Sequence, residues 1–313
     1  MSKYKVVVSD QVFPSVDIER ELLAGIDAEL TVASGDVEAV LSVAADADAI
    51  LNTYLPWSAT SIARLDNCRI IARYGIGFDN VDLDAARQAG IVVTNVPDYS
   101  VEEVATHGLG LILAALRKIV TADQGVRAGE WNVDNVRPIR RLSTLTVGLV
   151  GFGRIARKLA APLEALGAEI IAHDPYLQAG EGLPPLLTLD EVLGRADIVS
   201  LHVPLTDETR GLIGGDAING MKSGAILVNT SRGPLVDLDA VGRALRDGKL
   251  SAAALDVFDV EPLDPARVAD IPNLIATPHM AYYSEEALQE SQRKAATQVI
   301  KVLTGEEPDY RVN

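Results

Sequence analysis

Cysteine and aromatic residues are scarce in this chain of 313 residues. It has one cysteine, and aromatic residues make up 4% of the sequence. A single cysteine excludes an intrachain disulfide, and the apolar segment around Cys68 predicts a buried structural side chain there rather than a reactive thiol. Aliphatic side chains and alanine must therefore supply most of the core packing.

Basic tracts and long apolar runs are missing as well. The net charge of −16 would repel the phosphates of nucleic acids, so we expect no direct binding to DNA or RNA. The longest apolar stretch, residues 108–116, is too short to cross a bilayer, and the first residues run straight into a strand pattern without a signal-peptide region. We expect a cytoplasmic protein with no membrane partner.

The composition that remains is that of an ordinary globular protein. Hydrophobic residues make up 48% of the chain and charged residues 23%, which gives no sign of disorder or of repeats. Since single domains usually have roughly 100–200 residues, the length predicts two domains.

Strand-like apolar runs alternate with helical patterns over the first hundred residues. This alternation predicts a parallel sheet covered by helices on both faces. The expected strands lie near residues 4–10, 28–34, 47–53, 68–75 and 91–96, with helices near 17–24, 37–44, 58–65 and 81–88.

The rhythm changes at residues 100–120, which predict one long inter-domain helix, with Ser100 and Glu103 at the spacing of a capping box. A second strand and helix series follows. We expect the last helix, near 284–304, to pack back on the first domain. The expected strands of the second series lie near 145–151, 169–174, 197–203, 225–231, 251–258 and 273–278. The predicted domains are therefore 1–98 plus 285–313, and 99–284.

A glycine-rich turn in the second series carries the first chemical signal. Gly151 and Gly153 stand between a strand and a helix, with small Ala156 at the third position of a dinucleotide motif. Asp174 ends the next strand, about 20 residues further on, where an acid would bind the ribose hydroxyls of NAD and repel the 2′-phosphate of NADP. The residues alone also allow a tight turn with a capping aspartate, and the motif names a fold rather than a reaction, since methyltransferases and nucleotide-sugar enzymes share it.

Three ionisable residues follow later strands of the second series: Arg232, Glu261 and His279. The ends of strands are where open α/β sheets place their ligands. Each residue alone is typical of a surface loop. Together they supply an anion binder, an acid or base, and a carboxylate to orient it.

These motifs together resemble the D-isomer-specific 2-hydroxyacid dehydrogenase family. ARYGIGFDNVD, NVPDYSVEEVATHGLGLILA, VGFGRIAR, NTSRGPLVD, ALDVFDVEP and TPHMA occur in the family's order and spacing over most of the chain. The resemblance implies two Rossmann-like or flavodoxin-like domains with the active-site cleft between them, NAD as cofactor, no metal, and a homodimer.

The resemblance also implies a role for individual residues. His279 would be the proton donor to a 2-keto acid, assisted by Glu261, and Arg232 would bind the substrate carboxylate and polarise the carbonyl. Further substrate contacts would come from Gly75, Ile76, Gly77, Tyr54 and Tyr282. The implied cofactor contacts are Ser100, Gly151, Gly153, Arg154, Ile155, Asp174, His202, Val203, Pro204, Thr230 and Asp256.

Two departures separate this chain from many family members. Tyr282 stands where a glycine is common, which is closer to the branch resembling C-terminal binding proteins, and an aromatic ring there would restrict the pocket. Thr106 stands where glutamate is frequent.

Alternative functions remain open from the sequence. One is a binding protein of the C-terminal binding protein type, in which NAD(H) controls assembly. Another is an oxidoreductase for a formate- or phosphite-type substrate, against which Glu261 and His279 argue, because formate oxidation needs no proton on a carbonyl oxygen.

Overall fold

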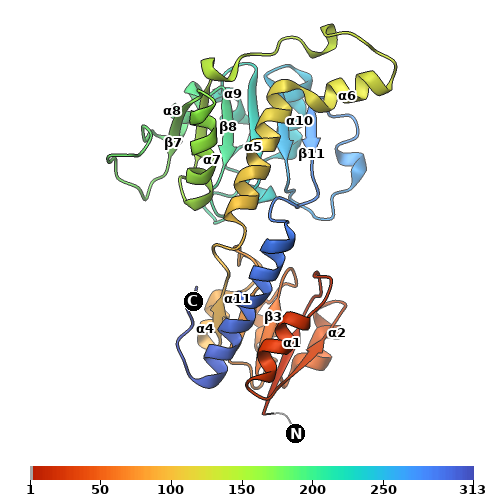
Figure 1. The fold of residues 1–313 in the computed structure, drawn as a ribbon, viewed down its shortest axis with the longest axis vertical. Helices are drawn as coiled ribbons and strands as arrows, with labels where there is room; N and C mark the ends of the chain where they lie inside the picture. Colours follow the sequence, from red (N-terminus) through yellow and green to blue (C-terminus); the bar gives the residue numbers. More distant parts are fainter. Residues whose placement is uncertain (1–2) are drawn as a thin grey trace. The chain divides into compact units, whose positions relative to one another are not determined.

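The computed structural model describes residues 3–313, which divide into two compact units. The first holds the described residues up to Ser100 together with Ser284–Asn313, and the second holds Val101–Tyr283. Each unit contains one sheet with helices packed on it (Figure 1). Every pair of named strands is parallel, which confirms the predicted class of two doubly wound α/β domains.

The first sheet has five strands in the order β2-β1-β3-β4-β5. This order reverses between β1 and β3, and the carboxyl ends of strands at such a switch point are the usual ligand site of open α/β sheets. The strands are β1 (Tyr4–Val8), β2 (Ala28–Val32), β3 (Ala49–Asn52), β4 (Ile70–Arg73) and β5 (Val92–Thr94).

Helices cover both faces of the first sheet because side chains alternate along each strand. Val7, Ile50 and Ile71 point to one face, where they pack against α2, α3 and α4, while α11 packs on β3, β4, β5 and the helix α1. These helices are α1 (Asp17–Ala24), α2 (Val37–Ala44), α3 (Ala59–Ile62), α4 (Leu83–Gln88) and α11 (Glu285–Thr304).

Local sequence decides where several of these helices begin. The side chains of Asp36, Asp82 and Ser284 each accept a hydrogen bond from the backbone N–H three residues later, at the first turns of α2, α4 and α11. Such caps satisfy N–H groups that have no partner within the helix. Gly305, with a φ of 88°, ends α11 in the left-handed conformation that glycine adopts without strain.

A buried carboxylate, that of Glu19 on α1, joins three elements of the first unit. It is fully buried and accepts hydrogen bonds from Tyr74 Oη at 2.7 Å and from Gln292 Nε2 at 2.9 Å. Burial, reinforced by the nearby Glu19 carboxylate, raises the pKa of Tyr74 well above its usual value, so its hydroxyl stays protonated and donates. Ser291 Oγ donates to the carbonyl oxygen of Tyr74. The network fixes α11 and α1 to the end of β4.

The second sheet has six strands in the order β11-β10-β9-β8-β6-β7. A parallel bridge between Ala172 and Leu186 adds one further strand position to the sheet, beyond β7. With this position included, the strand order around β6 is that of a dinucleotide-binding fold. The order reverses between β6 and β8, which is the switch point. The strands are β6 (Thr146–Val150), β7 (Glu169–His173), β8 (Ile198–Leu201), β9 (Ala225–Asn229), β10 (Leu250–Leu255) and β11 (Leu274–Ala276).

The second sheet is also packed on both faces. Helices α5 and α7 share one hydrophobic cluster with Val147 and Leu149, whereas α8, α9 and α10 share another with Val150 and Val199. The helices are α5 (Val101–Arg117), α6 (Ile119–Arg127), α7 (Arg154–Ala165), α8 (Leu189–Arg195), α9 (Gly215–Gly220) and α10 (Leu238–Arg246), with short 3₁₀ turns at Asp134–Val136, Leu142–Thr144, Gly233–Leu235 and Pro265–Arg267.

The prediction of one helix over residues 100–120 was wrong. Lys118 adopts a left-handed conformation, with a φ of 53°, and the chain bends by 59° between α5 and α6. The physical reason is burial: α5 packs Leu111, Ile112 and Leu116 into the core, whereas α6 has no buried residue to hold it on the same axis. The expected capping box is also missing, because the Ser100 hydroxyl is buried and has no hydrogen-bond partner.

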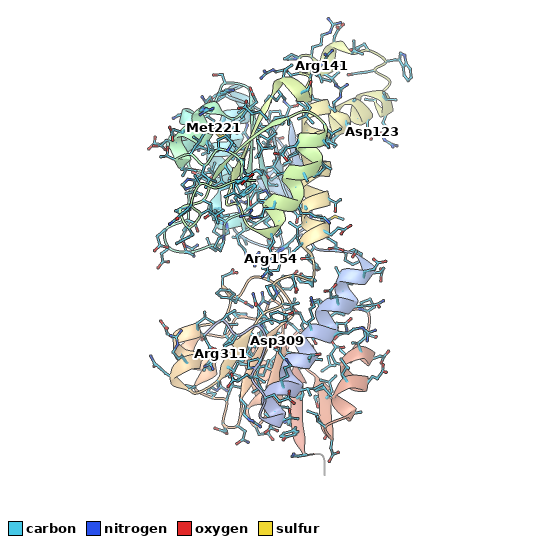
Figure 2. The ribbon with its side chains drawn as sticks, turned by 60° about the vertical axis from the view of Figure 1, so that its left-hand side comes forward. Asp123, Arg141, Arg154, Met221, Asp309 and Arg311 are labelled. Atoms are coloured by element: carbon cyan, nitrogen blue, oxygen red, sulfur yellow. The ribbon has the colours of Figure 1, made fainter. Side chains whose placement is uncertain are left out.

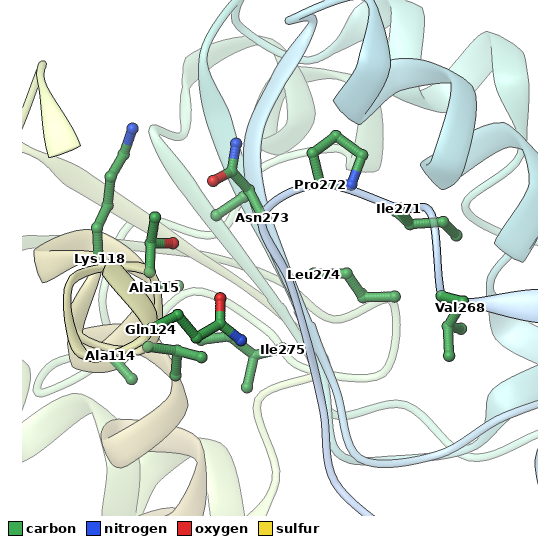
Figure 3. A pocket seen from close by; sticks show the side chains of 14 residues that line it. Ala114, Ala115, Lys118, Gln124, Val268, Ile271, Pro272, Asn273, Leu274 and Ile275 are labelled. Carbon is green, nitrogen blue, oxygen red and sulfur yellow. The ribbon is translucent and has the colours of Figure 1, made fainter. Parts of the chain in front are cut away.

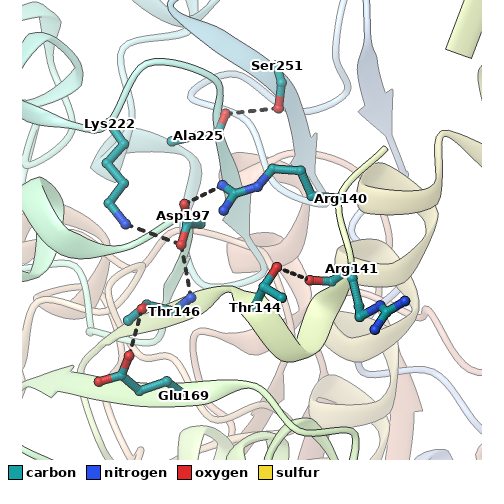
Figure 4. A network of polar contacts seen from close by, with 9 residues as sticks. All are labelled: Arg140, Arg141, Thr144, Thr146, Glu169, Asp197, Lys222, Ala225 and Ser251. Atoms are coloured by element: carbon teal, nitrogen blue, oxygen red, sulfur yellow. Dashed lines mark hydrogen bonds and ion pairs between the residues drawn. The ribbon is translucent and has the colours of Figure 1, made fainter. Parts of the chain in front are cut away.

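At the amino edge of the second sheet, Asp197 connects three segments (Figure 4). Its carboxylate accepts hydrogen bonds from Arg140 Nη1 at 2.6 Å, Lys222 Nζ at 3.2 Å and the N–H of Thr146 at 3.0 Å. Burial would raise the pKa of Asp197, but these donors outweigh it and lower the pKa. The cluster holds the segment before β6 at the amino ends of the strands. The carboxyl ends lie at the opposite edge of the sheet.

A cavity of about 330 Å³ lies between α5, α6 and the segment around β11 (Figure 3). Lys118, Gln124, Ile271 and Leu274 are among its lining residues, and no candidate site residue lines it. Among the described residues, no single helix has the length and apolar character to cross a membrane, although α5 and the bent α6 meet those criteria when taken together.

Tyr74→Phe should lower the free energy of unfolding by about 1–3 kcal/mol, because the buried Glu19 carboxylate loses a donor that nothing replaces. The free energy of unfolding is measured by urea denaturation. Tyr176→Phe is the matched control, since Tyr176 is 94% exposed, and it should change stability by less than about 0.5 kcal/mol. Equal effects of the two substitutions would contradict a structural role for the Tyr74 hydroxyl.

Candidate functional site

Three neighbouring strands of the second sheet end in the loops that carry Arg232, Glu261 and His279. The loops follow β9, β10 and β11, which lie side by side in the sheet. Because all three strands are parallel, their carboxyl ends meet at one edge. The structure therefore brings these three predicted residues to the same edge of one unit.

His279 and Glu261 form a direct pair. Nδ1 of His279 lies 2.7 Å from Oε2 of Glu261, and the other carboxylate oxygen of Glu261 accepts a hydrogen bond from the N–H of Phe258 at 2.8 Å. With its proton on Nδ1, the imidazole donates to the carboxylate.

The pair has a definite charge state at Glu261. Burial would raise the pKa of this carboxyl, but the hydrogen bonds from His279 and Phe258 and the charge of Arg232 outweigh burial and lower the pKa below its usual value. Glu261 therefore remains a carboxylate through neutral pH, and acidification removes its charge only below the usual range for glutamate.

The backbone of His279 is held in an unusual conformation. Its φ is 51°, in the left-handed region, which a non-glycine residue adopts only when its surroundings enforce it. Asp256 at the end of β10 provides that constraint. Its backbone carbonyl accepts the N–H of His279 at 2.7 Å, and its fully buried carboxylate accepts the N–H groups of Met280 at 3.0 Å and Ala281 at 2.9 Å.

The Asp256 carboxylate is thus a structural anchor for the loop that carries His279. It also accepts a hydrogen bond from Thr277 Oγ1 at 2.5 Å, and His107 Nε2 lies 3.2 Å from the same hydroxyl. His107 on α5 thus supports the loop from the side of Thr277. The sequence reasoning gave Asp256 a cofactor contact and missed its role as an anchor.

Arg232 sits in a loop that is shaped by Asn229 and Gly233. The buried Asn229 side chain donates from Nδ2 to the carbonyl oxygen of Arg232 at 2.8 Å and accepts from the N–H of Ser231 at 3.0 Å. Gly233 is packed against the backbone of Phe258, where an added Cβ would lie 1.8 Å from the carbonyl carbon. The close approach joins the Arg232 loop to the Glu261 loop. Neither Asn229 nor Gly233 was predicted from the sequence to have this role.

The glycine-rich turn lies at the switch point of the second sheet. Gly151, with a φ of 87°, follows β6, and an added Cβ would lie 2.8 Å from the backbone of His202 after β8. At Gly153 an added Cβ would meet nothing within 4 Å, and no side chain caps the first turn of α7. Buried Ala156 packs in the core beneath. The turn thus offers open space and uncapped N–H groups at a helix N-terminus, which suits an anion such as a pyrophosphate.

Asp174 is tied directly to this turn. Its carboxylate accepts the N–H of Phe152 at 2.9 Å and the N–H of Tyr176 at 3.0 Å. Arg154, at the start of α7, is exposed, and Figure 2 shows it at the strand-end side of the second unit, away from Met221. Ile155 follows it on the same helix turn and is partly buried against the core.

The remaining predicted cofactor residues lie on the loops after β8 and β9. Burial lowers the pKa of His202 to about 4, so its ring is neutral, and Nε2 lies 2.9 Å from Ser200 Oγ. Val203 and Pro204 follow it. Thr230 is buried, and its hydroxyl has no hydrogen-bond partner among the described residues. A buried hydroxyl without a partner is costly unless a ligand satisfies it.

The other predicted substrate residues fall in different parts of the chain. Tyr282 belongs to the second unit, and its ring centroid lies 6.1 Å from that of His279, nearly perpendicular to it. Tyr54 and the segment Gly75–Gly77 belong to the first unit, at the carboxyl ends of β3 and β4. Trp57 is buried, and its Nε1 donates to Asn52 Oδ1 at 3.0 Å, so this ring anchors its loop.

Comparison with known proteins gives consistent matches. Residues 109–281 match the NAD binding domain of the D-isomer specific 2-hydroxyacid dehydrogenase family. A curated D-3-phosphoglycerate dehydrogenase from Methanocaldococcus jannaschii is 38% identical over 91% of this chain, which covers 55% of that protein. The chain thus spans about half the length of the curated relatives it matches.

Solved structures resemble the chain over almost its full length. The TT0316 protein from Thermus thermophilus is 35% identical with a TM-score of 0.88, covering 99% of this chain and 100% of that one. A D-lactate dehydrogenase from Aquifex aeolicus, complexed with NAD and lactic acid, is 30% identical with a TM-score of 0.89, covering 96% of each chain.

Gly233→Ala should lower the free energy of unfolding by about 3 kcal/mol or more, because the new Cβ would overlap the Phe258 backbone and force the two loops apart. Gly215→Ala is the matched control: it lies in the first turn of α9, where an added Cβ meets nothing within 4 Å, and it should be neutral or slightly stabilising. Urea denaturation measures both. A Gly233→Ala protein as stable as Gly215→Ala would contradict the close approach of the loops.

Proposed function

The chain belongs to the D-isomer specific 2-hydroxyacid dehydrogenase family, and from this premise we propose that it transfers a hydride between NAD(H) and a 2-keto acid/D-2-hydroxy acid pair. The observation that carries the proposal is the His279–Glu261 pair, at 2.7 Å, on the strand ends that also present Arg232. Reduction of a keto group requires one proton on oxygen as well as the hydride on carbon.

His279 is the proton donor in this proposal. Glu261 holds the imidazole through Nδ1, so that Nε2 gives a proton to the carbonyl oxygen during reduction and takes it back during oxidation. The loop anchored by Asp256 keeps the ring in place. Preorganised geometry of this kind lowers the barrier, because no reorientation is needed at the moment of reaction.

Arg232 and the segment Gly75–Gly77 bind the substrate carboxylate in the same proposal. A guanidinium presents a planar set of donors that matches a carboxylate and stays charged at all working pH values. Arg232 would also polarise the adjacent carbonyl. The backbone N–H groups of the glycine-containing segment are suited to an anion because small residues let a ligand approach the main chain.

The second unit has the features that NAD requires. The open turn at Gly153, the left-handed Gly151 and the unsatisfied Thr230 hydroxyl all fit a dinucleotide. When bound there, NADH supplies the hydride for C2 of the keto acid. We assign the pyrophosphate to Gly151, Gly153, Arg154 and Ile155, the ribose to Asp174, the adenine to His202, Val203 and Pro204, and the remaining contacts to Ser100, Thr230 and Asp256.

A second copy of the chain is the partner that we propose. Exposed apolar side chains gather on α6 and the segment after it, at Ile119, Val126, Trp131 and Val133, and Trp131 is 88% exposed. The cavity that α6 lines lies on the same unit. An isologous dimer pairs the same patch of both subunits, and exposed apolar side chains of this kind mark such a patch.

His279→Ala should lower kcat by roughly 10²–10⁴, because the general acid is removed while the fold is kept. The measurement is NADH oxidation at 340 nm with a panel of 2-keto acids from glyoxylate to phenylpyruvate, repeated with NADPH. Because the Asp174 carboxylate repels a 2′-phosphate, we expect NADH to be preferred.

The matched control for this variant is His173→Gln. It removes another imidazole of the second unit, one that hydrogen-bonds the carbonyl oxygen of Leu187, and it should retain turnover. Unchanged turnover in His279→Ala would exclude His279 as the acid. Binding of NADH without turnover of any keto acid would instead support the NAD(H)-controlled binding protein.

Trp131→Glu should convert the dimer to a monomer, because it places a charge at the centre of the exposed apolar segment. Light scattering coupled to gel filtration would show the mass fall from twice that of the chain to that of one chain. Tyr176→Glu, at another highly exposed aromatic residue, should leave the mass unchanged. A monomeric parent protein would contradict the proposed partner.

A further inference from the structure

The first sheet has a ligand-binding edge of its own, at the switch point between β1 and β3. The loop after β1 starts at Ser9, and the loop after β3 starts at Thr53. In an open parallel sheet, an anionic group of a ligand would bind to backbone N–H groups at such a point. Three consecutive N–H groups, those of Thr53, Tyr54 and Leu55, are gathered here.

An internal carboxylate already occupies this set of donors. Asp10 accepts hydrogen bonds from the N–H groups of Thr53 at 2.8 Å and Leu55 at 3.1 Å, and also from that of Tyr54. Ser9 Oγ donates to the same carboxylate at 2.6 Å. These N–H groups are therefore already bound to a carboxylate of the chain. The negative charge of Asp10 would repel a second anion placed beside it.

A second set of backbone N–H groups, at Gly75–Gly77, is not occupied by a carboxylate of the chain. The carbonyl oxygens of these residues are held by the unit itself: Gly75 accepts from Val96 N–H at 3.0 Å, Ile76 from Asn95 Nδ2 at 2.7 Å, and Gly77 from Arg73 Nε at 2.8 Å. Their N–H groups have no intramolecular acceptor among the described residues.

The charge beneath this segment is positive. Arg73 is buried, and its Nη2 lies 3.7 Å from the place of an added Cβ on Gly75. A buried guanidinium close to a segment whose N–H groups have no internal acceptor suits one small anion, such as a carboxylate.

Beyond Arg73, the described loops of this edge offer no cation for a further anionic group. The five loops that follow the strands of this sheet, residues 9–16, 33–36, 53–58, 74–82 and 95–100, contain no lysine or arginine and contain Asp10, Asp36, Asp79, Asp82 and Asp98. Nearby Lys294 is paired with Asp98 at 2.7 Å and with Glu290 at 2.6 Å.

The same loops expose apolar side chains. Val12 is 41% exposed, Tyr54 48% and Phe78 37%, and each comes from a different strand end. Exposed apolar groups at a ligand-binding edge favour an apolar ligand, because burying them on binding is stabilising.

We propose that the substrate is a 2-keto monocarboxylate with an uncharged, apolar side chain, and that Asp10 disfavours phosphorylated and dicarboxylic acids. This specificity rests on the proposed dehydrogenase function. It separates the chain from its curated relatives named D-3-phosphoglycerate dehydrogenase, whose name specifies a phosphorylated acid. The anion site at Gly75–Gly77 is used by the carboxylate next to the keto group, so a second negative group finds no further cation in the loops of this edge and faces the charge of Asp10 instead.

The test compares kcat/KM, with NADH, for two groups of 2-keto acids. Pyruvate, 2-oxoisocaproate and phenylpyruvate have uncharged side chains, whereas 3-phosphohydroxypyruvate and 2-oxoglutarate carry further negative charge. We expect the best uncharged acid to exceed the best charged acid by about 100-fold or more, mainly through KM, since juxtaposed like charges cost several kcal/mol.

Asp10→Asn identifies the source of the discrimination. It keeps the size and one acceptor oxygen of the side chain but removes its charge. The ratio of kcat/KM for the best uncharged acid to that for the best charged acid should therefore fall at least about tenfold. Asp66→Asn is the matched control, because it removes one exposed charge from the opposite edge of the same sheet, between α3 and β4. The same ratio measured for Asp66→Asn should equal that of the parent protein.

The two levels of the proposal fail in different ways. If a phosphorylated or dicarboxylic acid is turned over as well as the uncharged acids, the specificity is wrong and the dehydrogenase function stands. If Asp10→Asn and Asp66→Asn leave the same ratio, the role of Asp10 is wrong. If NADH binds and none of these acids is reduced, the dehydrogenase function itself is contradicted.

Discussion

The candidate catalytic edge depends on the fully buried carboxylate of Asp256. It accepts hydrogen bonds from Thr277, Met280 and Ala281, and these hold the residue between them, His279, in a left-handed conformation that costs free energy on its own. The resulting position of the imidazole is what brings Nδ1 to Glu261. Without the anchor, the loop after β11 would relax toward ordinary backbone angles, and the pair would separate although both residues were present.

The sequence predicted the elements of the fold well, because the strands are short and apolar and alternate with helical patterns. It failed at Lys118. Local pattern continues the helix there, whereas tertiary burial ends at Leu116 and leaves the next turn nothing to pack on. Propensity over a short window carries no information about where a core stops.

The candidate site was predictable to a similar degree and for a similar reason. Arg232, Glu261 and His279 follow strands, and parallel topology brings strand ends together whatever the distance along the chain. The supporting residues could not be found this way. Gly233 matters because of the backbone of Phe258, which belongs to the loop after another strand, and the acceptor role of Asp256 depends on N–H groups of a loop whose path the sequence does not state. A strand-end aspartate is equally suited to a ligand, a cap or a turn.

The two sheets share a topology but use their switch points differently. After β6, Gly151 and Gly153 leave the main chain bare, so that the edge is open to an anionic cofactor. In the loop after β1, Asp10 instead accepts hydrogen bonds from the backbone of the loop after β3. In the first unit we propose the segment Gly75–Gly77, beside the buried Arg73, as the site of the substrate carboxylate. A common fold can in this way serve a dinucleotide in one domain and a small acid in the other.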